Sequence, residues 1–183
     1  MHRIAAISFS LLCCFIITNG KAQVYAVNNG SIDFVSEAKL ELIKASSKEL
    51  KGRLDLSKKA FAFVVAINSF NGFNSPLQKE HFNENYLESN QYPNAIFSGK
   101  IIEDLDISKD ETYSIRAKGT LNIHGVAQER IIKCYLTVNK GQITVTSNFT
   151  VQLAEHNIPI PKIVHEKLAS EIKVEVNAIM LPK

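Results

Sequence analysis

The chain has 183 residues, of which 45% are hydrophobic, and its 21 Lys and Arg nearly balance 18 Asp and Glu, giving a formal net charge of +3. This length suits one domain that buries a core of its own. Lysines alternate with glutamates, as in Lys48-Glu49-Leu50-Lys51, so no clustered basic face forms and a nucleic-acid partner is excluded.

The first residues have the pattern of a secretory signal peptide. Arg3 is followed by an apolar run from Ile4 to Ile17 and by the small-x-small sequence Gly20-Lys21-Ala22, the order expected before a cleavage site. We therefore predict a signal peptide over residues 1–22, a single domain over residues 23–183, and a periplasmic or secreted protein. The run is shorter than the ~20 residues that span a bilayer, so no membrane span is expected.

Three cysteines are present, and two of them, Cys13 and Cys14, fall within the predicted signal peptide. Lipidation there is the less favoured alternative, because the residue before either cysteine is not small. Cleavage would leave Cys134 alone, so no internal disulfide is expected. Cys134 alternates with Ile132 and Leu136, which predicts a small buried hydrophobe that reacts slowly with thiol reagents.

Apolar and polar residues alternate through most of the remaining chain, with the period of strands buried on one face. The clearest alternation covers residues 112–123 and 142–153, and both runs are long for strands. Such lengths favour a coiled sheet that closes on itself. Further strands are predicted at residues 24–28, 31–36, 47–56, 60–68, 95–102, 129–138 and 171–181.

Turn residues separate several of these segments. Asn28-Asn29-Gly30, His124-Gly125 and Asn139-Lys140-Gly141 supply residues that tolerate positive φ, and the last two predict hairpins between long strands. Two short helices are expected, one beginning at Pro76 after the N-cap Ser75 and one over residues 162–170. The predicted fold class is all-β with two short helices, an antiparallel meander of about eight strands that forms a barrel.

The segment 60–67 is apolar on both faces of the predicted strand. In a barrel, one face would line the interior and the other would lie under a helix, a cover that Leu77, Phe82 and Tyr86 could supply. A barrel of about eight strands is either filled by side chains or holds one ligand. The pattern alone leaves both alternatives open.

If the barrel is hollow, the alternation selects the residues that line it. The predicted ligand-binding residues are Phe61, Phe63, Val65, Ile67, Ile115, Leu121, Phe149 and Val151, with Phe82 and Tyr86 closing the tunnel from the helix.

Catalytic patterns are missing from the sequence. His81, His124, His156 and His165 stand far apart without metal-ligand spacing, and the sequence has no Gly-rich phosphate loop or Gly-x-Ser-x-Gly elbow. No resident cofactor, metal or catalytic residue is therefore expected, and we interpret the chain as a binding protein rather than an enzyme.

Two separated stretches resemble the signature sequences of the YceI-like family. One runs from His81 to Ser89 and continues through Tyr92-Pro93-Asn94-Ala95-Ile96-Phe97-Ser98-Gly99, and the other covers residues 119–126. In that family a Phe-rich helix precedes Tyr-Pro-x-Ala-x-Phe, and a later strand reads Gly-x-Leu-x-x-x-Gly-Val. The chain departs from the family where His81-Phe82-Asn83 replaces a more acidic segment and Ala127-Gln128 replaces Thr-Lys.

The resemblance implies a lipocalin-like barrel in the periplasm whose apolar tunnel takes a polyisoprenoid chain, such as a polyprenyl diphosphate or a quinone tail. It also implies a homodimer. The departures leave the identity of the lipid open. Two alternatives are retained: a packed barrel that acts through a protein partner, and, less favoured, a haem or metal-dependent enzyme.

Overall fold

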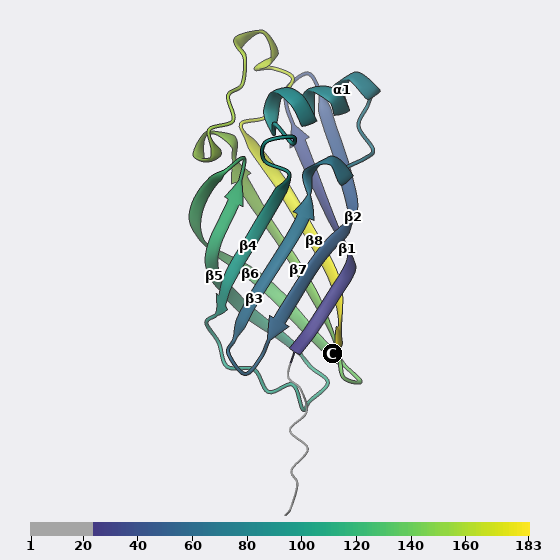
Figure 1. Cartoon of the computed structure of the whole chain (residues 1–183), viewed down its shortest axis with the longest axis vertical. Coiled ribbons are helices and arrows are strands. Elements are labelled where there is room, and N and C mark those ends of the chain that lie inside the picture. Colours follow the sequence, from purple (N-terminus) through teal and green to yellow (C-terminus); the bar gives the residue numbers. More distant parts are fainter. Residues whose placement is uncertain (1–23) are drawn as a thin grey trace, which may run out of the picture.

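The computed structural model of the chain describes residues 24–183, which form a closed antiparallel barrel of eight strands. The predicted signal peptide, with Cys13 and Cys14, lies outside the described residues. Each strand pairs with the next along the chain, and the last pairs with the first (Figure 1). This confirms the predicted fold class. The strands are β1 (Val24–Glu37), β2 (Leu42–Asp55), β3 (Ala60–Ala66), β4 (Asn94–Ile101), β5 (Thr112–Ile123), β6 (Val126–Asn139), β7 (Gln142–Gln152) and β8 (Glu171–Pro182).

The two ends of the barrel differ in what covers them. The helix end carries the connections after β1, β3, β5 and β7, and it lies at the top of Figure 1. The terminal end holds Val24 and Lys183, where the Lys183 N–H donates to the Val24 carbonyl at 2.9 Å. The short elements of the helix end are η1 (Ile67–Ser69), α1 (Pro76–His81), η2 (Phe82–Tyr86), η3 (Leu153–His156) and η4 (Lys162–Val164).

The first predicted helix is confirmed, and the second is wrong. Helix α1 begins at Pro76, and the Ser75 hydroxyl accepts from the Gln78 N–H at 3.2 Å, which satisfies one of the free donors of the first turn. The second shrinks to the single 3₁₀ turn of η4. Beyond it, the Glu166 carbonyl accepts from the Leu40 N–H at 2.8 Å, so the segment bonds to a neighbouring loop instead of continuing a helix.

Both predicted hairpins are present, whereas the third predicted turn is wrong. His124 and Gly125 join β5 to β6 with φ of 52° and 72°, and Lys140 and Gly141 join β6 to β7 with φ of 48° and 80°. Positive φ at both central residues matches the right-handed twist of the flanking strands. The sequence 28–30 is instead a bulge inside β1, because β2 and β8 pair with β1 on both sides of it.

Strands β4 and β5 approach each other closely at a pair of glycines. Gly99 and Gly119 face each other in register, and each belongs to one of the two signature stretches. A Cβ at Gly99 would overlap the Lys118 carbonyl oxygen and lie 2.5 Å from the Gly119 Cα. Only residues without a side chain allow the two backbones to pack this closely.

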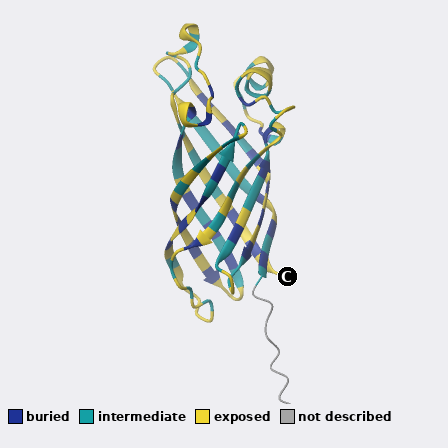
Figure 2. Ribbon diagram, turned by 60° about the vertical axis from the view of Figure 1, so that its left-hand side comes forward, coloured by how far each residue is buried: buried dark blue, intermediate teal, exposed yellow. Residues whose placement is uncertain are grey.

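Buried and exposed residues alternate along the strands (Figure 2), so the inward residues form the core. Toward the terminal end this core is tightly filled: Ile143, Ala178 and Met180 have no exposed surface, and Tyr25 and Val138 pack against the same cluster. Within residues 24–183, no helix has the length and apolar character needed to cross a membrane.

Candidate functional site

Two apolar cavities lie one after the other along the barrel axis. The helix-end cavity has a volume of about 150 Å³. Except for Ser36, Gln78 and Tyr86, its walls are apolar side chains. Its remaining lining residues are Ile32, Phe34, Ile43, Val65, Ile67, Phe70, Phe73, Phe82, Leu87, Ala95, Ile123, Val151, Leu153, Ile158, Leu168, Ile172 and Val174.

The terminal-end cavity continues the first one toward the chain termini, with a volume of about 90 Å³. Successive inward positions of one strand line first one cavity and then the other, as with Phe63 and Val65 on β3 or Phe149 and Val151 on β7. We call the two cavities together the tunnel. The terminal-end cavity is lined by Leu50, Leu54, Phe61, Phe63, Phe97, Ile101, Ile115, Ala117, Ile132, Cys134, Leu136, Val145, Ser147, Phe149 and Val176.

A third cavity, of about 290 Å³, lies at the helix end and is more polar. It shares Ile43, Gln78, Tyr86 and Leu168 with the helix-end cavity, so the two cavities lie next to each other with these residues as a common wall. We call it the vestibule. One end of the tunnel therefore borders the vestibule, and the other end meets fully buried, packed side chains.

A cluster of phenylalanines holds η2 against the tunnel. Phe82 stacks on Phe34 at 5.4 Å between ring centroids and lies 5.9 Å from Phe70 and 5.0 Å from Phe73. Aromatic rings at these separations attract one another beyond the area that they bury. All four rings line the helix-end cavity, so the turn that follows α1 forms part of the tunnel wall.

The structure brings nine of the ten predicted tunnel residues to the two cavities. Leu121 is buried, with 5% of its surface exposed, but lines neither cavity. Val65, Ile67, Phe82, Tyr86 and Val151 line the helix-end cavity, and Phe61, Phe63, Ile115 and Phe149 line the terminal-end cavity. Their role in ligand binding stays a prediction.

The predicted cover over the outer face of β3 is wrong. Ala62 is exposed on that face, Leu77 is 57% exposed, and Phe82 and Tyr86 line the tunnel instead. The outer face of β3 is short of apolar surface because three of its residues are alanines, and it therefore needs no helix over it.

The sequence prediction missed some of the residues that line the tunnel. Ile32 and Phe34 on β1, and Ile172 and Val174 on β8, follow the same alternation as the residues that were chosen, so the pattern could have found them. Phe73 comes from a connection without regular structure, where no period marks an inward position.

The wall of the barrel has a seam between β6 and β7. Their ladder runs only from Asn139↔Gln142 to Cys134↔Ser147, although β6 begins at residue 126 and β7 ends at residue 152. Thus, among the residues that the structure describes, no ladder joins the rest of the two strands. We call this stretch the seam.

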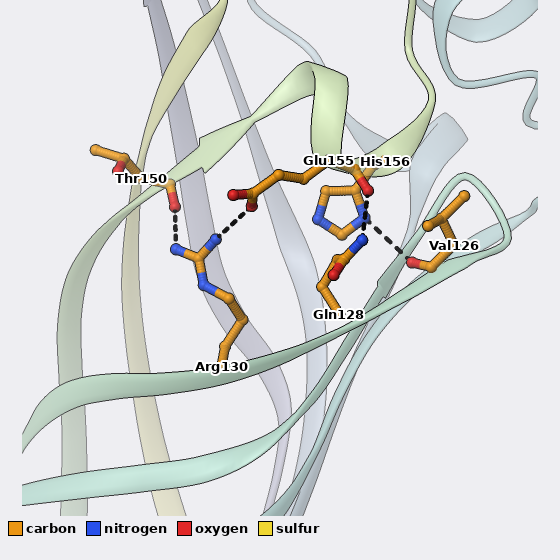
Figure 3. A network of polar contacts seen from close by, with 6 residues as sticks. All are labelled: Val126, Gln128, Arg130, Thr150, Glu155 and His156. Atoms are coloured by element: carbon orange, nitrogen blue, oxygen red, sulfur yellow. Dashed lines mark hydrogen bonds and ion pairs between the residues drawn. The ribbon is translucent and has the colours of Figure 1, made fainter.

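Side chains bridge the seam where the ladder is missing (Figure 3). Arg130 donates to the Thr150 carbonyl at 2.7 Å and to the Glu155 carboxylate at 3.0 Å. Gln128 donates to the Glu155 carbonyl at 2.7 Å. These bonds hold η3 over the seam and so complete the wall beside the helix-end cavity, which Leu153 of η3 lines.

Two histidines meet near this point, although the sequence places them far apart. His156 is fully buried, and the loss of hydration lowers the pKa of its imidazole. Its Nδ1 lies 3.1 Å from the Val126 carbonyl oxygen, and because a carbonyl only accepts, the Nδ1–H donates to it. His124 Nδ1 lies 3.1 Å from the His156 carbonyl, and its Nε2 lies 2.7 Å from the Glu88 carboxylate. Within residues 24–183, no group of three or more His, Cys, Asp or Glu side chains could hold a metal ion.

Cys134 lines the terminal-end cavity and is 7% exposed. Burial raises the pKa of its thiol, which reduces the reactive thiolate. We expect a thiol reagent at about pH 8 to label the folded protein at least about tenfold more slowly than the protein in denaturant. Equal labelling rates in mass spectrometry with and without denaturant would contradict the buried position of this side chain.

Comparison with known proteins supplies a family for this architecture. The model of the YceI-like domain matches residues 24–180. A polyisoprenoid binding domain from Saccharophagus degradans, implicated in plant cell wall breakdown, has a TM-score of 0.74 at 15% sequence identity, covering 89% of this chain and 100% of that domain. BcnA from Burkholderia cenocepacia has a TM-score of 0.66 at 14% identity, covering 82% of this chain and 95% of its own.

A Campylobacter jejuni YceI protein is also similar, with a TM-score of 0.57 at 15% identity, covering 76% of this chain and 84% of its own. Identities this low show a shared fold. No curated protein matches the chain.

Proposed function

Because the chain belongs to the YceI-like domain family, we propose that it binds a lipid with a long apolar chain, of polyisoprenoid or quinone-tail type, inside the tunnel. The observation that carries the proposal is the tunnel itself. Its two cavities are lined almost entirely by apolar side chains, and it meets packed core at the terminal end. A site of this kind suits a long hydrocarbon and offers little to a polar substrate.

The energetics agree with this choice of ligand. Each methylene removed from water contributes about 0.8 kcal/mol, so a long chain is held without a charged anchor. Ordering the flexible chain takes back part of that gain. A polar molecule would lose its hydrogen bonds to water in the tunnel and find few replacements, which disfavours it.

Two other functions remain as competitors. A packed barrel that acts through a protein partner would need no ligand. A haem or metal-dependent enzyme would contain a bound haem or metal ion. Native mass spectrometry of the protein purified from its own host separates the three. We expect a co-purifying lipid; a bound metal or haem would support the enzyme, and a chain free of any ligand would support the partner protein.

Truncation of Phe149 tests whether the barrel is hollow. Phe149 lines the terminal-end cavity, so Phe149→Ala enlarges an existing space and should cost clearly less than the ~3 to 5 kcal/mol of a new hole in a packed core. Ile143→Ala, at a site with no exposed surface, serves as the control and should cost about 2 to 5 kcal/mol. Both are measured by urea unfolding of lipid-free protein. If Phe149→Ala lost the full ~3 to 5 kcal/mol and the protein purified from its host carried no lipid, the proposal that it binds lipid in the tunnel would be overturned.

We also propose that the protein is exported, with residues 1–22 as the signal peptide. The support is the order of Arg3, the apolar run and the small residues before Gln23. Since Cys134 is the one free cysteine among the described residues, folding of the barrel does not require an oxidising compartment.

A further inference from the structure

One histidine joins two of the segments that enclose the helix-end cavity. His124 lies in the turn between β5 and β6, and its Nε2 is 2.7 Å from the carboxylate of Glu88 in the loop after η2. Its Nδ1 is 3.1 Å from the carbonyl oxygen of His156, the last residue of η3. Only 11% of the His124 side-chain surface is exposed. We call these three residues the junction.

The junction lies directly behind the wall of the helix-end cavity. Four side chains from its three segments line that cavity and belong to one apolar cluster: Ile123 beside His124, Leu87 beside Glu88, and Leu153 and Ile158 on the two sides of His156. The backbone at Glu88 and His124, and at Asn157 directly after His156, is left-handed, with φ of 44°, 52° and 55°. Such a backbone persists where the surroundings hold it, so the bonds at the junction help to fix the position of this wall.

The two bonds at the His124 ring need two protons. A carbonyl and a carboxylate only accept hydrogen bonds, whereas a neutral imidazole has a single N–H. The imidazolium donates from both nitrogens and satisfies Glu88 and the His156 carbonyl together. Without one of its protons, a lone pair on the ring faces an oxygen lone pair, and one bond is lost. Histidine is the side chain whose charge ordinarily changes between about pH 5 and 8.

The groups around the ring leave Glu88 as its charged partner. Tyr92, from the loop before β4, contacts the ring edge to face with 4.8 Å between centroids. Glu155 of η3 is paired with Arg130 of β6 at 3.0 Å. Burial lowers the pKa of the His156 imidazole, so the folded protein favours the neutral ring and loses stability there as the pH falls. A wall that opens as the pH rises therefore cannot result from His156.

We propose that the junction makes the exit of a bound apolar chain dependent on pH. The His124 imidazolium holds the loop of Glu88 against η3. When the ring loses a proton, these two segments separate and the wall of the helix-end cavity opens. This inference rests on the proposed function, because it concerns the release of a lipid from the tunnel.

The experiment measures release at about pH 5.5 and about pH 8, on the two sides of the histidine range. A fluorescently labelled polyprenol is loaded into the protein from detergent micelles and displaced by an excess of unlabelled polyprenol. We expect release about tenfold faster at the higher pH, the effect of losing one hydrogen bond to a charged group. His124→Asn keeps a residue that tolerates the left-handed backbone but cannot make both bonds, so it should release the probe fast at both pH values.

Glu88→Gln isolates the role of the proton. An amide both donates and accepts, so its NH2 group can donate to Nε2 of a neutral His124 ring while the Nδ1–H donates to the His156 carbonyl. Both bonds then survive at the higher pH, and release should be slow at both pH values. His165→Gln is the matched control, because His165 is exposed and contacts the Lys162 carbonyl of its own segment. It should keep the tenfold difference.

Equal release at the two pH values by the unsubstituted protein would overturn the proposed junction, and so would a Glu88→Gln variant that keeps the tenfold difference. Hydrogen exchange of lipid-free protein at the higher pH gives a second readout. The backbone N–H groups of Ser89 and Tyr92 donate to the carbonyls of Asn83 and Glu88, and they should exchange more slowly in Glu88→Gln than in the unsubstituted protein. Failure to take up the probe at either pH would instead overturn the proposed function, while the exchange rates still test the junction.

Discussion

A glutamate in place of Val65 should abolish lipid uptake. Val65 is 3% exposed and lines the helix-end cavity, so Val65→Glu places a carboxyl group among apolar walls. An unpaired buried charge costs several kcal/mol, and it also removes the apolar surface that a hydrocarbon chain would contact. Uptake of a labelled polyprenol from micelles, read by native mass spectrometry, should fall below detection.

Val64→Glu provides the control on the same strand. Val64 faces the other side of β3 and pairs with Lys51 and Ile96, so the new carboxylate gains a neighbouring ammonium and the tunnel is unchanged. If Val65→Glu does not fold, Val65→Phe fills the cavity with apolar bulk and should lower uptake in a folded barrel. Normal uptake by both Val65 variants would show that the lipid lies elsewhere.

Gly99→Ala should be the most damaging of the small substitutions. Its Cβ would overlap the Lys118 carbonyl oxygen and crowd the Gly119 Cα, and backbone atoms within a ladder cannot turn away as a flexible side chain can. We expect a loss of more than about 3 kcal/mol in the free energy of unfolding, at the upper end of what overpacking costs. Urea unfolding followed by circular dichroism measures it.

Gly141→Ala separates crowding from the general cost of replacing a glycine. A Cβ there would meet nothing within 4 Å, and the residue has φ of +80°, so only the left-handed backbone opposes the change, at about 1 kcal/mol. A similar loss for both variants would mean that β4 and β5 can separate at Gly99 without harm.

The sequence predicted the fold where the alternation was uninterrupted. Strand β5 covers Thr112–Ile123 as predicted, and β7 ends at Gln152, one residue early. The prediction failed at β1 because Asn28-Asn29-Gly30 has the composition of a turn and of a bulge alike. Pairing with β2 and β8 decides between them, and that pairing is a tertiary contact that no local pattern reports.

The candidate site was predictable to the extent that strands form it. Alternation chose the faces of β3, β5 and β7, but two strands that follow the same rule, β1 and β8, were passed over. Residues in irregular segments, such as Phe70 and Ile158, follow no regular alternation, and they line the tunnel because of the course that the connecting segments take. The seam was also beyond prediction, because Arg130 occupies an inward position of β6 that the pattern assigns to an apolar residue.

The seam also determines how this barrel avoids adding strands from other molecules. A strand with one unpaired side presents N–H and C=O groups to any extended segment that it meets, and such edges lead to aggregation. Among residues 24–183, the seam leaves two such edges facing each other, one on β6 and one on β7. Arg130 caps the Thr150 carbonyl and, through Glu155, holds η3 across the gap. These side chains thus protect against intermolecular strand pairing along the stretch where the β6–β7 ladder is missing.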